Sequence, residues 1–144
     1  DTLVHRDFHA SNLMLYKKQL ATIDTQDALI GNRVYDLASL IDDVRFKSNK
    51  KIKNKIYNYY LRLNKKKINK ITLLNDFEIL SVIRNMKIIG IFSRLEIRDK
   101  KIKYLKLIPH AWKLIEFRMK NNKIFDELKK VLNLNFPKKI RNSK

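Results

Sequence analysis

The chain has 144 residues, with 33 Lys and Arg against 14 Asp and Glu, no Cys, and a formal net charge of +19. This length suits one domain or one lobe, and the lack of Cys excludes a disulfide framework, thiol catalysis and Cys-ligated zinc. No apolar run approaches the roughly 18 residues of a membrane span, and charged residues interrupt the opening where a signal peptide would be apolar. We therefore expect a cytoplasmic protein with a modest core.

Three short strands are predicted in the first 23 residues. Residues 2–5 form a brief apolar and β-branched run, and residues 13–16 and 20–23 form two more, joined by a turn at 17–19. Such a hairpin would fold Asp24 back beside Asn12. We expect oxygen-bearing side chains to converge at the open end of this small sheet.

The residues at that end suit phosphoryl transfer, which needs a carboxylate to orient and deprotonate the acceptor and oxygen ligands for Mg²⁺. Asp7 fits the carboxylate, while Asn12 and Asp24 fit the ligands, because Mg²⁺ prefers hard oxygen donors and keeps several waters. An isolated Asp-x-x-x-x-Asn arises often by chance, and Asp24 alone could belong to an ordinary polar turn. Together, in this order and spacing, they favour a catalytic loop.

Helices are predicted beyond this point. The first spans Tyr35–Phe46, where Asp36 could also be an N-terminal carboxylate favoured by the helix dipole. Apolar residues at helical spacing indicate a second, amphipathic helix over residues 52–63. A third pattern runs over residues 73–97 and is apolar around much of its circumference between 79 and 95, which predicts a central buried helix.

The last third of the chain is also predicted to be helical. Gly90 within the long helix suggests close packing against a neighbour, and a loop at residues 99–101 leads to helices around 104–120 and 124–132. Trp112 and the other aromatic residues suit the core better than a ligand platform. We expect one domain over residues 1–136 without an internal linker, followed by a frayed basic tail at 137–144.

Four stretches together resemble a known family. Residues 5–12 read His-Arg-Asp-Phe-His-Ala-Ser-Asn and residues 23–28 read Ile-Asp-Thr-Gln-Asp-Ala, which is similar to the aminoglycoside phosphotransferase and choline kinase superfamily. Residues 26–45 and 84–112 resemble its bacterial anomeric amino-sugar kinases, which phosphorylate N-acetylmuramate and N-acetylglucosamine at C1 during cell-wall recycling. The resemblance implies an α+β fold: the mostly α-helical C-terminal lobe of a protein-kinase-like enzyme, with short β-hairpin segments carrying the catalytic loop.

The resemblance implies a role at each matching position. Asp7 would be the catalytic base, and Asn12 and Asp24 would bind Mg²⁺, with ATP as the phosphoryl donor. Three residues would support the catalytic loop: His5, His9 and Asp36. Two more lie where they could contact the acceptor: Gln26 and Asp27.

The nucleotide-binding parts of such a kinase are not found in this sequence. The chain has only two glycines, Gly31 and Gly90, so it holds no Gly-rich phosphate loop, and it shows no recognisable phosphate-pairing Lys with a helical Glu partner. We expect the N-terminal lobe upstream of Asp1, and we expect these residues alone to bind ATP poorly and to catalyse little.

Two other functions stay open. The acceptor could be an aminoglycoside or a choline-like amine, although a polycationic substrate would favour clustered carboxylates, and acidic residues are sparse beyond Arg45. The chain could also be an inactive kinase-like interaction module. The charge of +19 would attract phosphate backbones, yet no nucleic-acid motif accompanies it. We interpret the lysines as solvated helix faces rather than as a specific nucleic-acid site.

Overall fold

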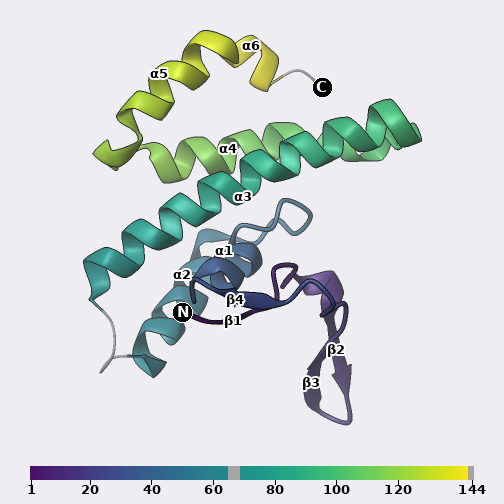
Figure 1. Cartoon of the computed structure of the whole chain (residues 1–144), viewed down its shortest axis with the longest axis vertical. Coiled ribbons are helices and arrows are strands. Elements are labelled where there is room, and N and C mark those ends of the chain that lie inside the picture. The colour runs from purple at the N-terminus through teal and green to yellow at the C-terminus, as the bar shows by residue number, and fades with distance from the viewer. Residues whose placement is uncertain (65–68, 143–144) are drawn as a thin grey trace. The chain divides into compact units, whose positions relative to one another are not determined.

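The computed structural model describes residues 1–64 and 69–142 and contains short strands followed by helices (Figure 1). The strands are β1 (Thr2–Val4), β2 (Leu13–Tyr16), β3 (Gln19–Thr22) and β4 (Leu29–Gly31). The helices are α1 (Tyr35–Ile41), α2 (Lys50–Leu63), α3 (Lys70–Asp99), α4 (Ile108–Met119), α5 (Asp126–Asn135) and α6 (Lys138–Arg141). Single 3₁₀ segments lie at Ala10–Asn12, Ile102–Leu107 and Lys123–Phe125. This composition confirms a mostly helical α+β fold.

The strands form two separate antiparallel pairs. β1 pairs with β4, with Thr2 opposite Gly31, and β2 pairs with β3, with Tyr16 opposite Gln19. Lys17 and Lys18 connect the second pair with φ angles of 47° and 65°, the positive values that a two-residue hairpin turn requires. The predicted hairpin is therefore confirmed, whereas β4 was not predicted because its three residues carry too short a pattern.

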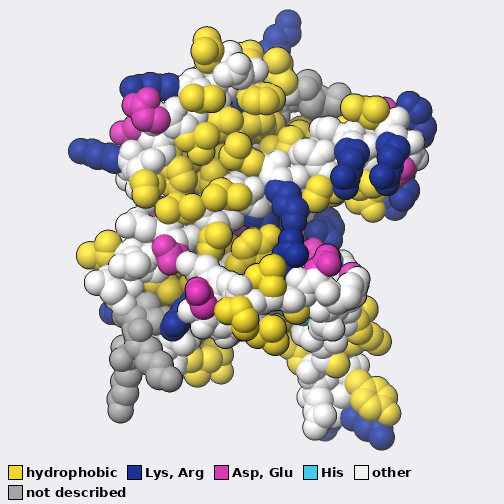
Figure 2. Space-filling model, viewed as in Figure 1, with side chains coloured by type: hydrophobic (Ala, Val, Ile, Leu, Met, Phe, Trp, Pro, Cys, Tyr) yellow, Lys and Arg dark blue, Asp and Glu magenta, His cyan; other side chains and the backbone are white. Residues whose placement is uncertain are grey.

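The β2–β3 hairpin exposes apolar side chains. Leu15 and Leu20 face each other in the register and are 78% and 66% exposed. Figure 2 shows hydrophobic side chains and Lys or Arg side chains at the surface at the lower right, where Figure 1 shows the hairpin. The hairpin is therefore held in place by its ends rather than by a core of its own.

The chain divides into two compact units, residues 1–80 and 81–144, and the boundary falls inside α3 rather than at a linker. In the first unit, α1, α2 and the start of α3 share one apolar core. It contains buried residues of α1 and α3, the buried residue just before α1, and half-buried residues of α2 around them: Leu37, Ala38, Ile41, Leu73, Phe77, Val34, Ile56, Tyr57, Tyr60 and Leu61. The rings of Tyr57 and Phe77 pack 5.1 Å apart, so α2 is fixed against α3.

Side-chain caps set where these helices begin. Asn49 Oδ1 accepts the Ile52 N–H at 2.9 Å at the start of α2, and Asn69 Oδ1 accepts the Ile71 N–H at 2.9 Å at the start of α3. α1 ends at Ile41, five residues before the predicted end. The reason is that the Asp43 carboxylate reaches forward to accept the Arg45 N–H at 3.0 Å, and this local turn replaces helical hydrogen bonding.

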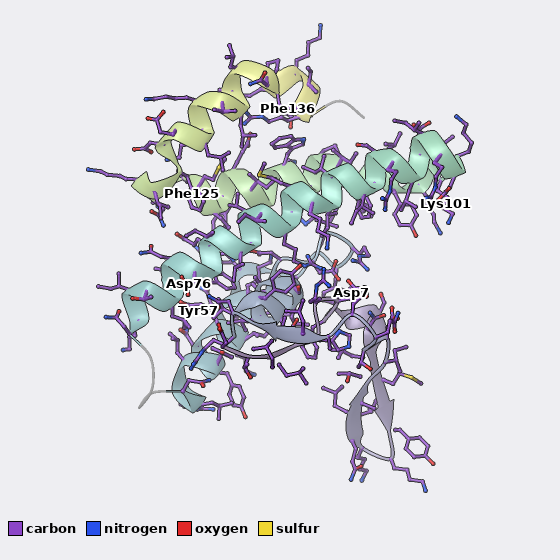
Figure 3. All side chains as sticks on the ribbon, viewed as in Figure 1. Asp7, Tyr57, Asp76, Lys101, Phe125 and Phe136 are labelled. Atoms are coloured by element: carbon purple, nitrogen blue, oxygen red, sulfur yellow. The ribbon has the colours of Figure 1, made fainter. Side chains whose placement is uncertain are left out.

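The second unit contains the rest of α3 with α4, α5 and α6. Trp112 is buried, as predicted for a core residue, and its ring packs 5.4 Å from that of Phe136 (labelled in Figure 3). Pro109 lies in the first turn of α4, where its missing N–H costs no hydrogen bond.

Two expectations for this part of the chain were wrong. A Cβ added to Gly90 would meet nothing within 4 Å, and the residue is exposed, so Gly90 does not mark a close helix contact. The region from 138 to 141 is not frayed: it forms α6, and Arg141 is buried, with its guanidinium bound to Glu116 and Asn133, each at 2.8 Å. Residues 143 and 144 of the expected tail lie outside the described residues.

α3 is not buried all round. Its buried side chains recur on one side, as at Phe77, Ser81, Asn85, Ile88 and Phe92, while Ile83 is 54% exposed. Within the described residues, no helix is both long and apolar enough to span a bilayer.

Candidate active site

The loop between β1 and the 3₁₀ segment Ala10–Asn12 is anchored by one carboxylate. Asp36, in the first turn of α1, accepts the backbone N–H of His5 at 2.7 Å and that of Arg6 at 3.0 Å. Arg6 has a φ of 70°, a left-handed conformation that is unfavourable for a residue with a side chain. The two charge-assisted hydrogen bonds offset this cost and fix the direction in which the chain enters Asp7.

Asp7 and Asn12 come together across this loop (Figure 3 labels Asp7). The loop closes through backbone bonds from His9 N–H to Asp7 O at 3.0 Å and from Asn12 N–H to His9 O at 2.9 Å. The Asn12 Nδ2 then donates to Asp7 O at 3.0 Å and to Asp7 Oδ2 at 3.4 Å. Because its nitrogen is committed to Asp7, the amide oxygen of Asn12 points elsewhere, as a metal ligand would need.

Asp24 follows β3 and is brought beside the same loop. The Ile23 N–H donates to Asn12 O at 3.1 Å, and the His5 Nε2–H donates to Ile23 O at 2.9 Å. The residue before Asp24 is therefore tied both to Asn12 and to His5. Asp24 has a φ of 67°, and its exposed carboxylate accepts a hydrogen bond from the Gln26 side chain.

His9 lies behind Asp7 and is 3% exposed. Its Nε2 is 3.3 Å from Asp7 Oδ2 and 2.7 Å from Arg45 Nη1. Arg45 is in turn held by Asp43, whose Oδ1 is 3.2 Å from Arg45 Nε and which is itself buried. Four side chains thus contact one another in series, from Asp43 through Arg45 and His9 to Asp7.

Burial lowers the pKa of His9 below its ordinary value of 6.5, and the positive charge of Arg45 lowers it further, while the Asp7 and Asp43 carboxylates oppose the shift. The folded protein therefore prefers neutral His9. Because the unfolded chain binds the proton more readily, the stability contributed by neutral His9 is present above pH 6.5 and is lost as the pH falls through the folded-state pKa.

We predict that the thermal midpoint will decline as the pH falls below 6.5, and that His9→Gln will flatten this part of the curve. Thermal melts of both proteins across this pH range in one buffer system measure the effect. A decline of equal slope in the variant would show that other groups cause it.

Most of the predicted site residues lie close together in the structure, but they make different kinds of contact. Asp7, Asn12 and the chain beside Asp24 converge, and Asp36 supports the loop. Asp27 is exposed, and its backbone oxygen accepts a hydrogen bond from Arg6 Nη1 at 3.4 Å. The sequence prediction did not assign a task to Asp43 or Arg45. The Asp-x-Arg spacing directly after the apolar part of α1 was the only available signal.

The donor set fits Mg²⁺. Within residues 1–64 and 69–142, no three His, Cys, Asp or Glu gather closely enough to hold a metal ion on their own. The carboxylate of Asp24 and the amide oxygen of Asn12 are hard oxygen donors at the loop, and a site with these two protein ligands would leave positions for phosphate oxygens and water.

Comparisons with known proteins agree with this geometry. Residues 1–64 match the model of the phosphotransferase enzyme family. N-acetylmuramate/N-acetylglucosamine kinases from three bacteria are similar over most of the chain. The Neisseria meningitidis protein is 35% identical over 111 residues, 74% of this chain and 33% of its own length. The Pseudomonas aeruginosa protein is 33% identical over 119 residues, which are 78% of this chain and 35% of its own length. The Caulobacter vibrioides protein is 29% identical over 113 residues, which are 75% of this chain and 31% of its own length. The chain spans about a third of the length of these relatives.

Proposed function

We propose that this chain, whose residues 1–64 match the phosphotransferase enzyme family, forms the catalytic part of an ATP-dependent amino-sugar kinase like the relatives it resembles over about three quarters of its length. The observation that carries the proposal is the pairing of Asp7 with the Asn12 amide nitrogen at a loop anchored on Asp36. This pairing presents a carboxylate for an acceptor hydroxyl and, beside it, an amide oxygen suited to a cation.

In the proposed reaction, the Asp7 carboxylate accepts a hydrogen bond from the sugar hydroxyl and aligns its oxygen with the γ-phosphorus of ATP. As the new O–P bond forms and the bond to ADP breaks, the hydroxyl proton passes to Asp7. Asn12 and Asp24 would hold Mg²⁺. The ion, when bound, neutralises the charge on the transferred phosphoryl group.

The acceptor is proposed from the similar proteins, whose names give N-acetylmuramate and N-acetylglucosamine. We assign the anomeric hydroxyl as the site of transfer. This hydroxyl is more acidic than an ordinary alcohol, so it demands less base strength of the group that takes its proton. The half-exposed Asp7 carboxylate is accessible to it. Asp27 and Gln26 follow Asp24 at the exposed rim and are proposed to contact the sugar.

The residues that bind the adenine and phosphate groups of ATP are proposed to come from a nucleotide-binding lobe in another part of the protein. These 144 residues contain only two glycines and no Gly-rich phosphate loop. We place the reaction in the cytoplasm, where ATP is available. The experiment must accordingly use the complete protein.

We predict that the complete protein with ATP and Mg²⁺ will release ADP when N-acetylmuramate or N-acetylglucosamine is added, and much less with an aminoglycoside or choline. Phosphorus NMR of the sugar product tests the position, since a phosphate on C1 couples to the anomeric proton. Transfer to an aminoglycoside alone would replace the proposed substrate, and transfer to another sugar hydroxyl would refute the anomeric assignment.

A further inference from the structure

The contact between Arg45 and His9 fixes which nitrogen of the His9 ring carries the hydrogen. Arg45 is a donor only and is always charged. With Nη1 at 2.7 Å from His9 Nε2, the Nε2 must supply its lone pair, so the ring hydrogen sits on Nδ1. The ring is therefore neutral and presents no donor to Asp7.

This arrangement is not the one that the ring would adopt by itself. His9 Nδ1 is buried and has no hydrogen-bond partner among the described residues, so an N–H at that position is left unsatisfied, at a cost. With the hydrogen on Nε2 instead, the ring could donate to Asp7 Oδ2, 3.3 Å away. The Arg45 guanidinium is what opposes that alternative.

The Asp43 carboxylate fixes the position of Arg45 beside His9. The Asp43 Oδ1 accepts both the Arg45 backbone N–H at 3.0 Å and the side chain through Nε at 3.2 Å. Asp43 is 2% exposed, so a buried carboxylate orients one edge of the guanidinium while Nη1 reaches the ring. His5 offers the contrast, because its Nε2 must carry the hydrogen that Ile23 O accepts.

We propose that Arg45 is a positioning residue that holds His9 in its Nδ1–H form and so keeps the Asp7 carboxylate free to accept the hydrogen of the substrate hydroxyl. The catalytic half of this inference rests on the proposed kinase function. Asp7 Oδ2 already accepts from Asn12 Nδ2 at 3.4 Å, so a His9 that donated to the same oxygen would fill its remaining lone pair and make it a poorer acceptor for the hydroxyl hydrogen.

The test combines ring spectroscopy with kinetics on the complete protein and on Arg45→Ala. Nitrogen-15 NMR of labelled histidine distinguishes a protonated from an unprotonated ring nitrogen, with His9 assigned through His9→Gln and His5 as the reference of opposite form. We expect the His9 hydrogen on Nδ1 in the wild type and on Nε2 in Arg45→Ala. We expect kcat to fall roughly 10- to 100-fold with KM for the sugar nearly unchanged.

Guanidinium at a low, non-denaturing concentration should restore part of the lost kcat, because the Arg45 side chain is 32% exposed and its place is open to a small cation. The exposed Arg62 on α2 provides the matched control as Arg62→Ala, which should keep both the ring form and kcat. If Arg45→Ala fails to fold, Arg45→Lys takes its place in the same measurements. Lysine keeps a positive charge beside Asp43, but its ammonium group cannot bond Asp43 and His9 together as the forked guanidinium does.

A wild-type His9 with its hydrogen on Nε2, or a ring form unchanged in Arg45→Ala, would overturn the assignment. A changed ring form with unaltered kcat would overturn the positioning role. Absence of sugar phosphorylation by the wild type would instead refute the proposed function, and the NMR spectra would still decide what Arg45 does to His9.

Discussion

Replacing Asp7 with Asn in the complete protein should lower kcat for sugar phosphorylation by roughly 1,000-fold, the order of effect expected when a general base is removed. Asn has the same shape and can keep a contact with Asn12 Nδ2 through its oxygen, so the loop should stay in place. It cannot take up a proton, and its nitrogen would face the hydroxyl as a donor. KM for ATP should change little because Asp7 does not contact the nucleotide in the proposed reaction.

The measurement is sugar-dependent ADP release at saturating ATP. Asp126→Asn is the matched control, since Asp126 is an exposed carboxylate in the first turn of α5 whose partner is Lys129 at 2.9 Å. Turnover of Asp7→Asn equal to that of this control would remove Asp7 from the reaction.

Replacing Asp36 with Ala should destabilise the protein by about 3 kcal/mol and abolish activity. Two backbone N–H groups, of His5 and Arg6, would lose a charged acceptor at 2.7 and 3.0 Å, and hydrogen bonds to charged groups contribute about 1.5–3 kcal/mol each. The bond lost at Arg6 is also the one that holds its left-handed backbone. Urea unfolding of the variant measures the change.

Asp27→Ala serves as the control for this experiment, because the Asp27 side chain accepts no hydrogen bond from the described residues and is exposed. Its unfolding midpoint should match the wild type. An Asp36→Ala protein as stable as this control would show that the loop is held by other contacts.

The helical pattern of the sequence predicted where α2, α3 and α4 lie because apolar spacing over ten or more residues determines which face is buried. It could not predict the end of α1, since that end depends on the Asp43 side chain, which accepts the Arg45 N–H two residues further on. It also misjudged Gly90. A glycine in a helix indicates a close neighbour only when one is present, and none lies near it.

The candidate site was predictable in part. The order and spacing of Asp7, Asn12 and Asp24 indicated convergence, and the backbone bond between Ile23 and Asn12 brings the chain at Asp24 to the loop. Arg45 was beyond prediction, because it reaches His9 from 36 positions away in sequence and no local period encodes such a contact. The metal and catalytic roles of these residues stay predictions until the variants are measured.

The strands beside the site are only three or four residues long and pair two by two, and isolated two-stranded pairs are at best marginally stable in water. The loop therefore relies on side-chain bonds from α1 and from the residues after it. Segments with few buried contacts open at a lower free energy than the surrounding helices. Amide hydrogens of residues 5–12 should thus exchange with solvent through local opening while the core of α1 stays protected, so that this loop can change conformation without the helices unfolding.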